Sequence, residues 1–133
     1  MMVVNKPSII IYTDHADRDF LREVCAGIEE EGVLYQVTEK AGDLDTLSYE
    51  AAADSMLGSG IGITENRLAM QMQRLPKGRN VFELIAPTFR QCRNLGANSA
   101  RTIKKLPFKP LYGPGAAGDE PLCTFIQKVE TKA

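Results

Sequence analysis

The first thirty residues change their hydrophobic period, and this change constrains the fold more than any other feature. Ser8–Tyr12 is a short apolar run rich in β-branched residues, a pattern typical of a buried strand. Apolar side chains then recur at the period of an α-helix, and Gly32 follows where that helix would end. These apolar positions are Phe20, Leu21, Val24, Cys25 and Ile28. Thr13, Asp14 and Asp17 are candidate N-caps for the helix.

The rest of the chain continues this alternation. We expect strands at 33–38, 60–64, 68–73 and 81–85, and helices from Asp45 or Thr46 to Leu57 and from Pro87 to Lys105, the last interrupted by Gly96. A tight turn near Glu65 predicts an antiparallel pair between the third and fourth strands. This order predicts one α/β domain over 1–109, with three layers (α/β/α) around a mixed, mostly parallel five-stranded sheet. Residues 110–133 form a Pro- and Gly-rich tail, in which 123–129 has the pattern of a terminal strand.

Composition excludes several classes of protein. A content of 44% hydrophobic residues in 133 is that of one globular domain rather than a disordered chain, and the longest apolar run is too short to cross a bilayer. The N-terminus lacks the pattern of a secretory signal. Three cysteines without C-x-x-C spacing favour neither a disulfide framework nor a zinc site. We therefore expect a cytoplasmic protein with no membrane contact.

The net charge of -1 conceals an asymmetry along the chain. Residues 14–54 hold twelve acids and three bases, whereas residues 87–118 hold six bases and no acid. The basic stretch lacks the aromatic residues and motifs of nucleic-acid binders, so we expect no nucleic-acid partner. It predicts either a solvated helix face or a surface for an acidic partner.

Glu29, Glu30 and Glu31, called the acidic triplet below, lie at the C-terminal end of the first predicted helix. The helix macrodipole is already negative there, so each exposed acid costs about 0.3–1 kcal/mol. We therefore expect a cation to meet at least one of them. Glu30 points away from the buried stripe and could serve a neighbouring chain. A lone carboxylate needs further donors to hold Mg²⁺, and an acidic solvated helix end is the alternative.

Two other motifs have ordinary structural explanations. His15 lies among acids at the start of the first helix, where a metal site or an acid–base pair is conceivable, but caps and a loop residue explain the pattern better. Residues 58–62, Gly-Ser-Gly-Ile-Gly, resemble a phosphate loop. They lead into a strand rather than out of one, which favours close backbone packing. With a single histidine and no nucleophile motif, we expect no catalytic residues in this chain.

The chain nevertheless resembles a known family. The resemblance lies in residues 21–32 (Leu-Arg-Glu-Val-Cys-Ala-Gly-Ile-Glu-Glu-Glu-Gly), Gly60–Ile63, Leu75–Pro76 and residues 94–101. These residues are similar to the small subunit of the factor that reactivates cobalamin-dependent diol and glycerol dehydratases. They are also similar to the related medium subunit of those dehydratases. Three features favour the reactivating factor: the short segment before the first strand, the compact Gly60–Leu75 spacing, and a final helix region at 95–108. The tail from Leu122 looks more like the dehydratase subunit, which stays as the alternative.

The resemblance implies a function that residue patterns alone do not. The fold would be like that of an anticodon-binding domain, and the partner a large actin-like ATPase subunit that binds ATP and ADP. The complex would release damaged cobalamin from dehydratase, contacted transiently, with the small subunit exchanging for the dehydratase medium subunit. Glu30 matches a position that contributes to a Mg²⁺ held mainly by the large subunit, and Glu29 and Glu31 would flank that interface. The resemblance leaves open a location in a bacterial microcompartment.

Overall fold

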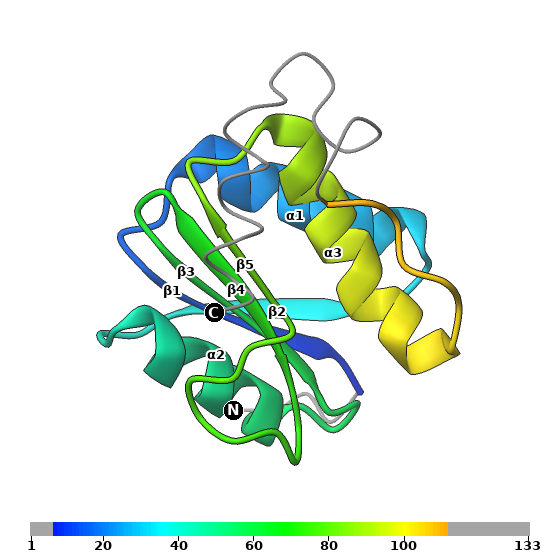
Figure 1. The fold of residues 1–133 in the computed structure, drawn as a ribbon, viewed down its shortest axis with the longest axis horizontal. Coiled ribbons are helices and arrows are strands. Elements are labelled where there is room, and N and C mark those ends of the chain that lie inside the picture. The colour runs from blue at the N-terminus through cyan, green and yellow to red at the C-terminus, as the bar shows by residue number, and fades with distance from the viewer. Residues whose placement is uncertain (1–6, 112–133) are drawn as a thin grey trace.

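A computed structural model describes residues 7–111, which form five strands and three helices (Figure 1). The elements are β1 (Ile9–Asp14), α1 (Arg18–Glu30), β2 (Tyr35–Glu39), α2 (Leu44–Asp54), β3 (Ser59–Thr64), β4 (Arg67–Met72), β5 (Phe82–Ile85) and α3 (Phe89–Lys104). The predicted order of elements is confirmed. The strand predicted at 123–129 lies outside the described residues.

The sheet has the strand order β2-β1-β3-β4-β5. β1 pairs in parallel with both β2 and β3, whereas β4 is antiparallel to both β3 and β5. β4 therefore runs against the direction shared by the other four strands of the sheet, as predicted for a mixed, mostly parallel sheet. The tight turn between β3 and β4 contains Glu65 with a φ of 51°.

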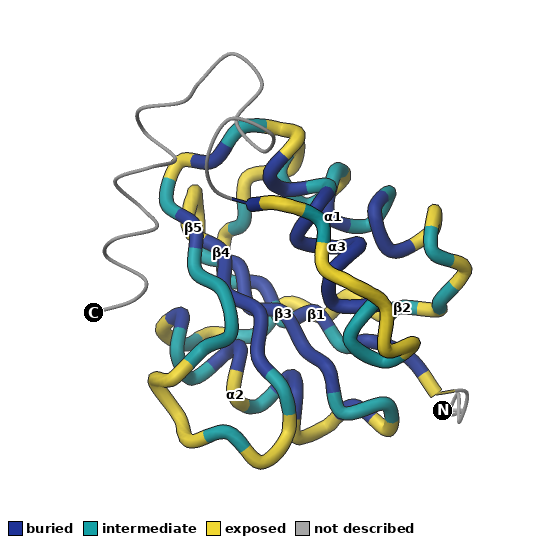
Figure 2. The backbone as a smooth tube through the Cα atoms, turned by 45° about the vertical axis from the view of Figure 1, so that its right-hand side comes forward, coloured by how far each residue is buried: buried dark blue, intermediate teal, exposed yellow. Residues whose placement is uncertain are grey.

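The helices cover both faces of the sheet. α1 and α3 pack against each other on one face, and α2 packs on β1, β3 and β4 from the other (Figure 1). Buried residues follow β1, β3 and β4 and the inner sides of the helices (Figure 2). The core on the α1 and α3 face includes Ile9, Ile11, Ile61 and Leu95, all fully buried. Within residues 7–111 no helix has the length and apolar character needed to cross a bilayer.

Side-chain hydrogen bonds define the start of α1 and the end of α2, and they correct two predictions about helix ends. Asp17 is the N-cap of α1, because its side chain accepts hydrogen bonds from two backbone amides, whereas Asp14 belongs to β1. The prediction that the second helix reaches Leu57 was wrong. α2 stops at Asp54 because the Ser55 hydroxyl donates to Ser8 O and accepts from Leu57 N, which turns the chain toward β3.

The predicted interruption at Gly96 was also wrong, since α3 is continuous from Phe89 to Lys104. A Cβ on Gly96 would lie 2.0 Å from Val24 O, and a Cβ on Gly27 would lie 2.0 Å from Arg93 O. These two glycines let the backbones of α1 and α3 approach closely. The absence of a side chain at position 96 therefore serves helix packing and does not break the helix.

Candidate functional site

The acidic triplet meets its cations within the chain. Glu30 Oε2 accepts a hydrogen bond of 2.8 Å from Arg93 Nη1. The other side of the same guanidinium contacts Glu23, with Nε 2.9 Å and Nη2 2.8 Å from Glu23 Oε1. Arg93 thus joins two carboxylates of α1 to α3. The Glu30 side chain remains 46% exposed, so it is accessible from outside the chain.

Glu31 has the most complete set of partners in the triplet. Its carboxylate accepts from Arg101 Nε at 2.9 Å and from Lys104 Nζ at 3.2 Å, and its side chain is only 9% exposed. Burial by itself raises the pKa of Glu31, but the hydrogen bonds from Arg101 and Lys104 outweigh it and bring the pKa below its usual value. Glu31 therefore stabilises the contact between α1 and α3.

Glu29 lies on the other side of the helix end. Its Oε2 accepts a hydrogen bond of 2.7 Å from the Tyr35 hydroxyl, and this bond is the largest cause that raises the pKa of Tyr35. Each member of the triplet therefore has a different partner. The sequence correctly predicted that a cation meets the triplet. The packing of α1 on α3 decides that these cations come from the basic stretch of the same chain.

A cleft of about 290 Å³ lies beside Glu30, between α1 and the N-terminal half of α3. We call it the α1–α3 cleft. Its lining residues are Glu23, Glu30, Phe89, Arg90, Arg93, Asn94 and Lys109. Arg90, Arg93 and Lys109 belong to the basic stretch noted in the sequence and Asn94 to the family motif, whereas nothing in the sequence analysis singled out Phe89. One sequence signal could have indicated Phe89. It directly follows the Thr88 N-cap, a position outside the buried face of α3, where an exposed aromatic side chain is unusual.

A divalent cation at Glu30 would need donors from outside this chain. Mg²⁺ takes about six oxygen ligands, and Glu30 offers a carboxylate of which one oxygen already pairs with Arg93. Glu23 is the nearest other acid of the cleft, and it too is bonded to Arg93. Glu30 could therefore supply one ligand to a cation that another chain holds. The described acids of the cleft do not form a complete metal site by themselves.

His15 belongs to a second group of polar side chains, at the C-terminal ends of β1 and β2. Ligand atoms of Asp14, His15 and Glu39 all lie within 4.8 Å of one another. Each carboxylate oxygen, however, already has a partner: His15 Nδ1 and Gly42 N for Asp14, and Thr13 Oγ1 and His15 N for Glu39. The hydrogen bond to Asp14 is the largest cause that raises the pKa of His15. These contacts hold the loops that follow β1 and β2, which agrees with the structural explanation that the sequence favoured for His15.

The remaining candidates have structural roles. The glycines of 58–62 lead into β3, and a Cβ on Gly60 or Gly62 would collide with the backbone of α2, so they permit close packing. Burial is the largest cause that raises the pKa values of the Cys25 and Cys92 thiols. Neither thiol is suited to be a nucleophile. Cys123 lies outside the described residues.

Comparison with known proteins decides the family. The family model described as "Dehydratase medium subunit" matches residues 6–109. The propanediol dehydratase-reactivating factor small subunit of Salmonella typhimurium is 33% identical over 108 residues, which cover 80% of this chain and 93% of that protein. The chain belongs to this family of reactivating-factor small subunits and dehydratase medium subunits. The recognition from sequence motifs is confirmed.

Other members of the family agree with this assignment. The diol dehydratase-reactivating factor small subunit of Klebsiella michiganensis is 34% identical over 107 residues, 79% of this chain and 86% of that protein. A solved glycerol dehydratase reactivase superposes with a TM-score of 0.76 at 28% identity, covering 80% of this chain and 99% of that one. A diol dehydratase-reactivating factor complexed with ADP and Mg²⁺ superposes with a TM-score of 0.75 at 31% identity, covering 80% and 100%. The α/β fold is therefore that of a reactivating-factor small subunit.

Proposed function

We propose that this chain is the small, non-catalytic subunit of an ATP-dependent factor that reactivates cobalamin-dependent diol or glycerol dehydratase. The observation that carries the proposal is the match to named small subunits over nearly their whole length, in both sequence and fold. The described side chains support a non-catalytic role, because His15 is held by Asp14 and both described thiols have raised pKa values. ATP and ADP would bind to a large, actin-like partner subunit.

The proposed mechanism is subunit exchange with a chaperone-like result. The family model described as "Dehydratase medium subunit" matches this chain, which is also similar to reactivating-factor small subunits, and this supports a shared fold of the two kinds of chain. The large subunit would release this chain and pair with the medium subunit of dehydratase in its place. That transient contact would loosen the dehydratase and free the damaged cobalamin. The assembly would act in the cytoplasm or in a bacterial microcompartment, which fractionation of cell extracts distinguishes.

Glu30 is the proposed contribution of this chain to a shared Mg²⁺. The ion would be held mainly by the large subunit, with Glu30 adding one carboxylate oxygen and with Glu29 and Glu31 flanking the interface. When bound, Mg²⁺ would neutralise carboxylates of both chains and so join them. Two features support Glu30: its side chain is half-exposed, and Arg93 remains held by Glu23 when Glu30 turns away.

The first prediction compares Glu30→Gln with Glu50→Gln. Both acids are about half-exposed and each forms an ion pair with one exposed cation, Arg93 for Glu30 and Lys40 for Glu50, but Glu50 lies on α2 at the other face of the sheet. Binding to the large subunit in Mg²⁺ and ADP should weaken about 10- to 100-fold for Glu30→Gln and less than about twofold for Glu50→Gln. Titration calorimetry with and without Mg²⁺ measures this. Equal affinities of the two variants would remove Glu30 from the metal site.

The alternative function is the dehydratase medium subunit itself, favoured by the description of the family model. Isolation of the tagged chain from its host in Mg²⁺ and ADP, followed by mass spectrometry, separates the two functions. Recovery of an actin-like ATPase supports the reactivating factor. Recovery of the large and small dehydratase subunits, with bound corrinoid, supports the alternative.

A further inference from the structure

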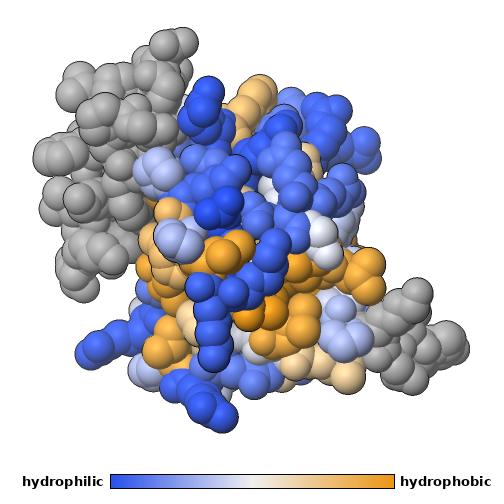
Figure 3. All heavy atoms as spheres, turned by 90° about the vertical axis from the view of Figure 1, so that its right-hand side faces the viewer, coloured by the Kyte–Doolittle hydropathy of each residue, from blue (hydrophilic) through white to orange (hydrophobic). Residues whose placement is uncertain are grey.

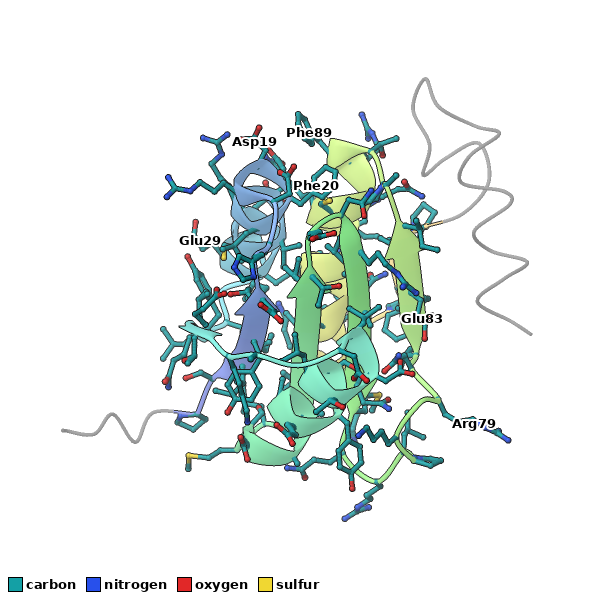
Figure 4. All side chains as sticks on the ribbon, turned by 90° about the vertical axis from the view of Figure 1, so that its left-hand side faces the viewer. Asp19, Phe20, Glu29, Arg79, Glu83 and Phe89 are labelled. Carbon is teal, nitrogen blue, oxygen red and sulfur yellow. The ribbon has the colours of Figure 1, made fainter. Side chains whose placement is uncertain are left out.

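The α1–α3 cleft has an exposed aromatic residue at its rim. Phe89, the first residue of α3, is 53% exposed, and its ring meets Phe20 edge-on with centroids 6.0 Å apart. Phe89 and Phe20 lie together at one end of the molecule, with Asp19, and far from Arg79 (Figure 4). Phe20 holds the ring against α1, so Phe89 is presented outward in a defined position. A fixed, half-exposed aromatic ring is a common anchor at protein interfaces.

The cations that line the cleft differ in their partners among the described residues. Arg93 bonds to both acids of the lining, Glu23 and Glu30. The other two cations, Arg90 and Lys109, form no ion pair with any carboxylate among residues 7–111. Arg90 also lies in the first turn of α3, where the helix macrodipole disfavours a cation and favours an anion. The cleft lining holds three cations and two carboxylates and so has a net positive charge, in a chain whose net charge is -1.

Side chains of α3 hold the backbone at Lys109 in place. Asn98 accepts a hydrogen bond from Lys109 N at 2.6 Å and donates one to Lys109 O at 2.9 Å. Asn94, which also lines the cleft, donates to Pro110 O at 2.9 Å. Both asparagines are buried. These bonds hold the backbone at Lys109 beside the cleft, so little backbone freedom would be lost when a partner binds there.

We propose that the α1–α3 cleft docks an acidic segment of the larger subunit, with carboxylates on Arg90 and Lys109 and an apolar side chain against Phe89. This proposal rests on the proposed function. Two observations favour this partner: Arg90 and Lys109 form no ion pair with a carboxylate among residues 7–111, and the cleft is continuous with Glu30. A partner that holds Mg²⁺ near Glu30 would supply one or two carboxylates there, and these would lie beside the cations of the cleft. Hydrophilic residues gather in the upper part of the face shown in Figure 3, above a band of hydrophobic residues.

The test compares two charge reversals in the full chain. The double variant Arg90→Glu/Lys109→Glu should weaken binding to the large subunit about tenfold or more, mainly by slower association, and should remove most of the salt dependence of the association rate. The control Lys77→Glu/Arg79→Glu makes the same change of charge in the exposed loop between β4 and β5, at the other end of the molecule (Figure 4). It should bind within about twofold of wild type. Phe89→Ala should speed dissociation without changing the salt dependence.

The outcomes separate this proposal from the function on which it rests. If the wild-type chain does not bind the large subunit, both are wrong. If it binds and the Arg90/Lys109 variant binds equally well, or if both double variants weaken binding alike, the cleft is not the docking surface and the proposed function stands. Thermal unfolding of each variant shows that the fold is retained. Because Glu30 is intact in all three variants, loss of the Mg²⁺ ligand cannot explain a difference.

Discussion

Glu31 shows how one residue can turn an unfavourable sequence position into a stabilising contact. An acid at the C-terminal end of a helix is opposed by the macrodipole, yet here Arg101 and Lys104 of α3 approach the same carboxylate, and the Lys104 ammonium also donates to Glu31 O. The side chain is 9% exposed, so water weakens these bonds little. Removing the charge would leave two cations at the helix end without their partner.

We predict that Glu31→Gln lowers the free energy of unfolding at pH 7 by about 1–3 kcal/mol, the range for hydrogen bonds to charged groups. The fold lowers the pKa of Glu31, so its contribution is present above the usual value of 4.5 and is lost as the pH falls through the folded-state pKa. The difference between wild type and variant should therefore shrink as the pH falls below 4.5. Urea unfolding at a series of pH values from 7 downward measures this, and a difference that does not shrink through the acid titration would contradict the electrostatic explanation.

At the scale of elements, the contact between α1 and α3 positions the candidate site. Gly27 of α1 faces Arg93 O, and Gly96 of α3 faces Val24 O, so each glycine admits the backbone of the other helix. The side chain of Arg93 leaves α3 at this crossing and reaches Glu23 and Glu30. The same close approach that packs the helices therefore brings the acidic triplet to its cations.

We predict that Gly27→Ala destabilises the fold by about 3 kcal/mol, because the new methyl meets backbone rather than a flexible side chain. Gly32→Ala is the control: no atom lies within 4 Å of its Cβ, and only its φ of +78° opposes the substitution, at about 1 kcal/mol. Denaturant unfolding compares the two variants. An equal cost would show that the helices can separate at little expense.

At the scale of the whole molecule, the chain doubles back along α3 after Lys104. Buried amide side chains of α3 hold the returning backbone: Asn98 bonds Lys109, Asn94 bonds Pro110 O, and Gln91 donates to Leu111 O at 2.9 Å. Leu111 is 2% exposed and belongs to the core. The domain boundary predicted after residue 109 therefore falls within a region that still contacts α3.

We predict that Leu111→Ala costs about 2–5 kcal/mol of stability, the range for a buried leucine. Leu106→Ala should cost less than about 1 kcal/mol, because Leu106 follows the same helix but is 41% exposed. Thermal or urea unfolding of the full chain distinguishes them. Similar small costs would mean that the folding unit ends before Leu111.

The sequence determined the elements and their order. The β-branched run at Ser8–Tyr12, the helical stripe that ends at Ile28 and the alternation around Met70 predicted strands and helices because local side-chain period depends on backbone geometry alone. The motif at 21–32 also identified the family, which the relatives confirm. The predicted helix boundaries were less accurate. The end of α2 at Asp54 and the continuity of α3 through Gly96 depend on contacts with residues that are distant in the sequence.

Only the tertiary structure decided which charges meet. The sequence placed acids at the end of α1 and bases in α3, but Arg93 is 63 residues from Glu30 in the chain, and their pairing depends on where two helices cross. No local pattern encodes that crossing, because it results from packing against the sheet and from close contacts at Gly27 and Gly96. The α1–α3 cleft arises in the same way, from three segments that are adjacent only after folding.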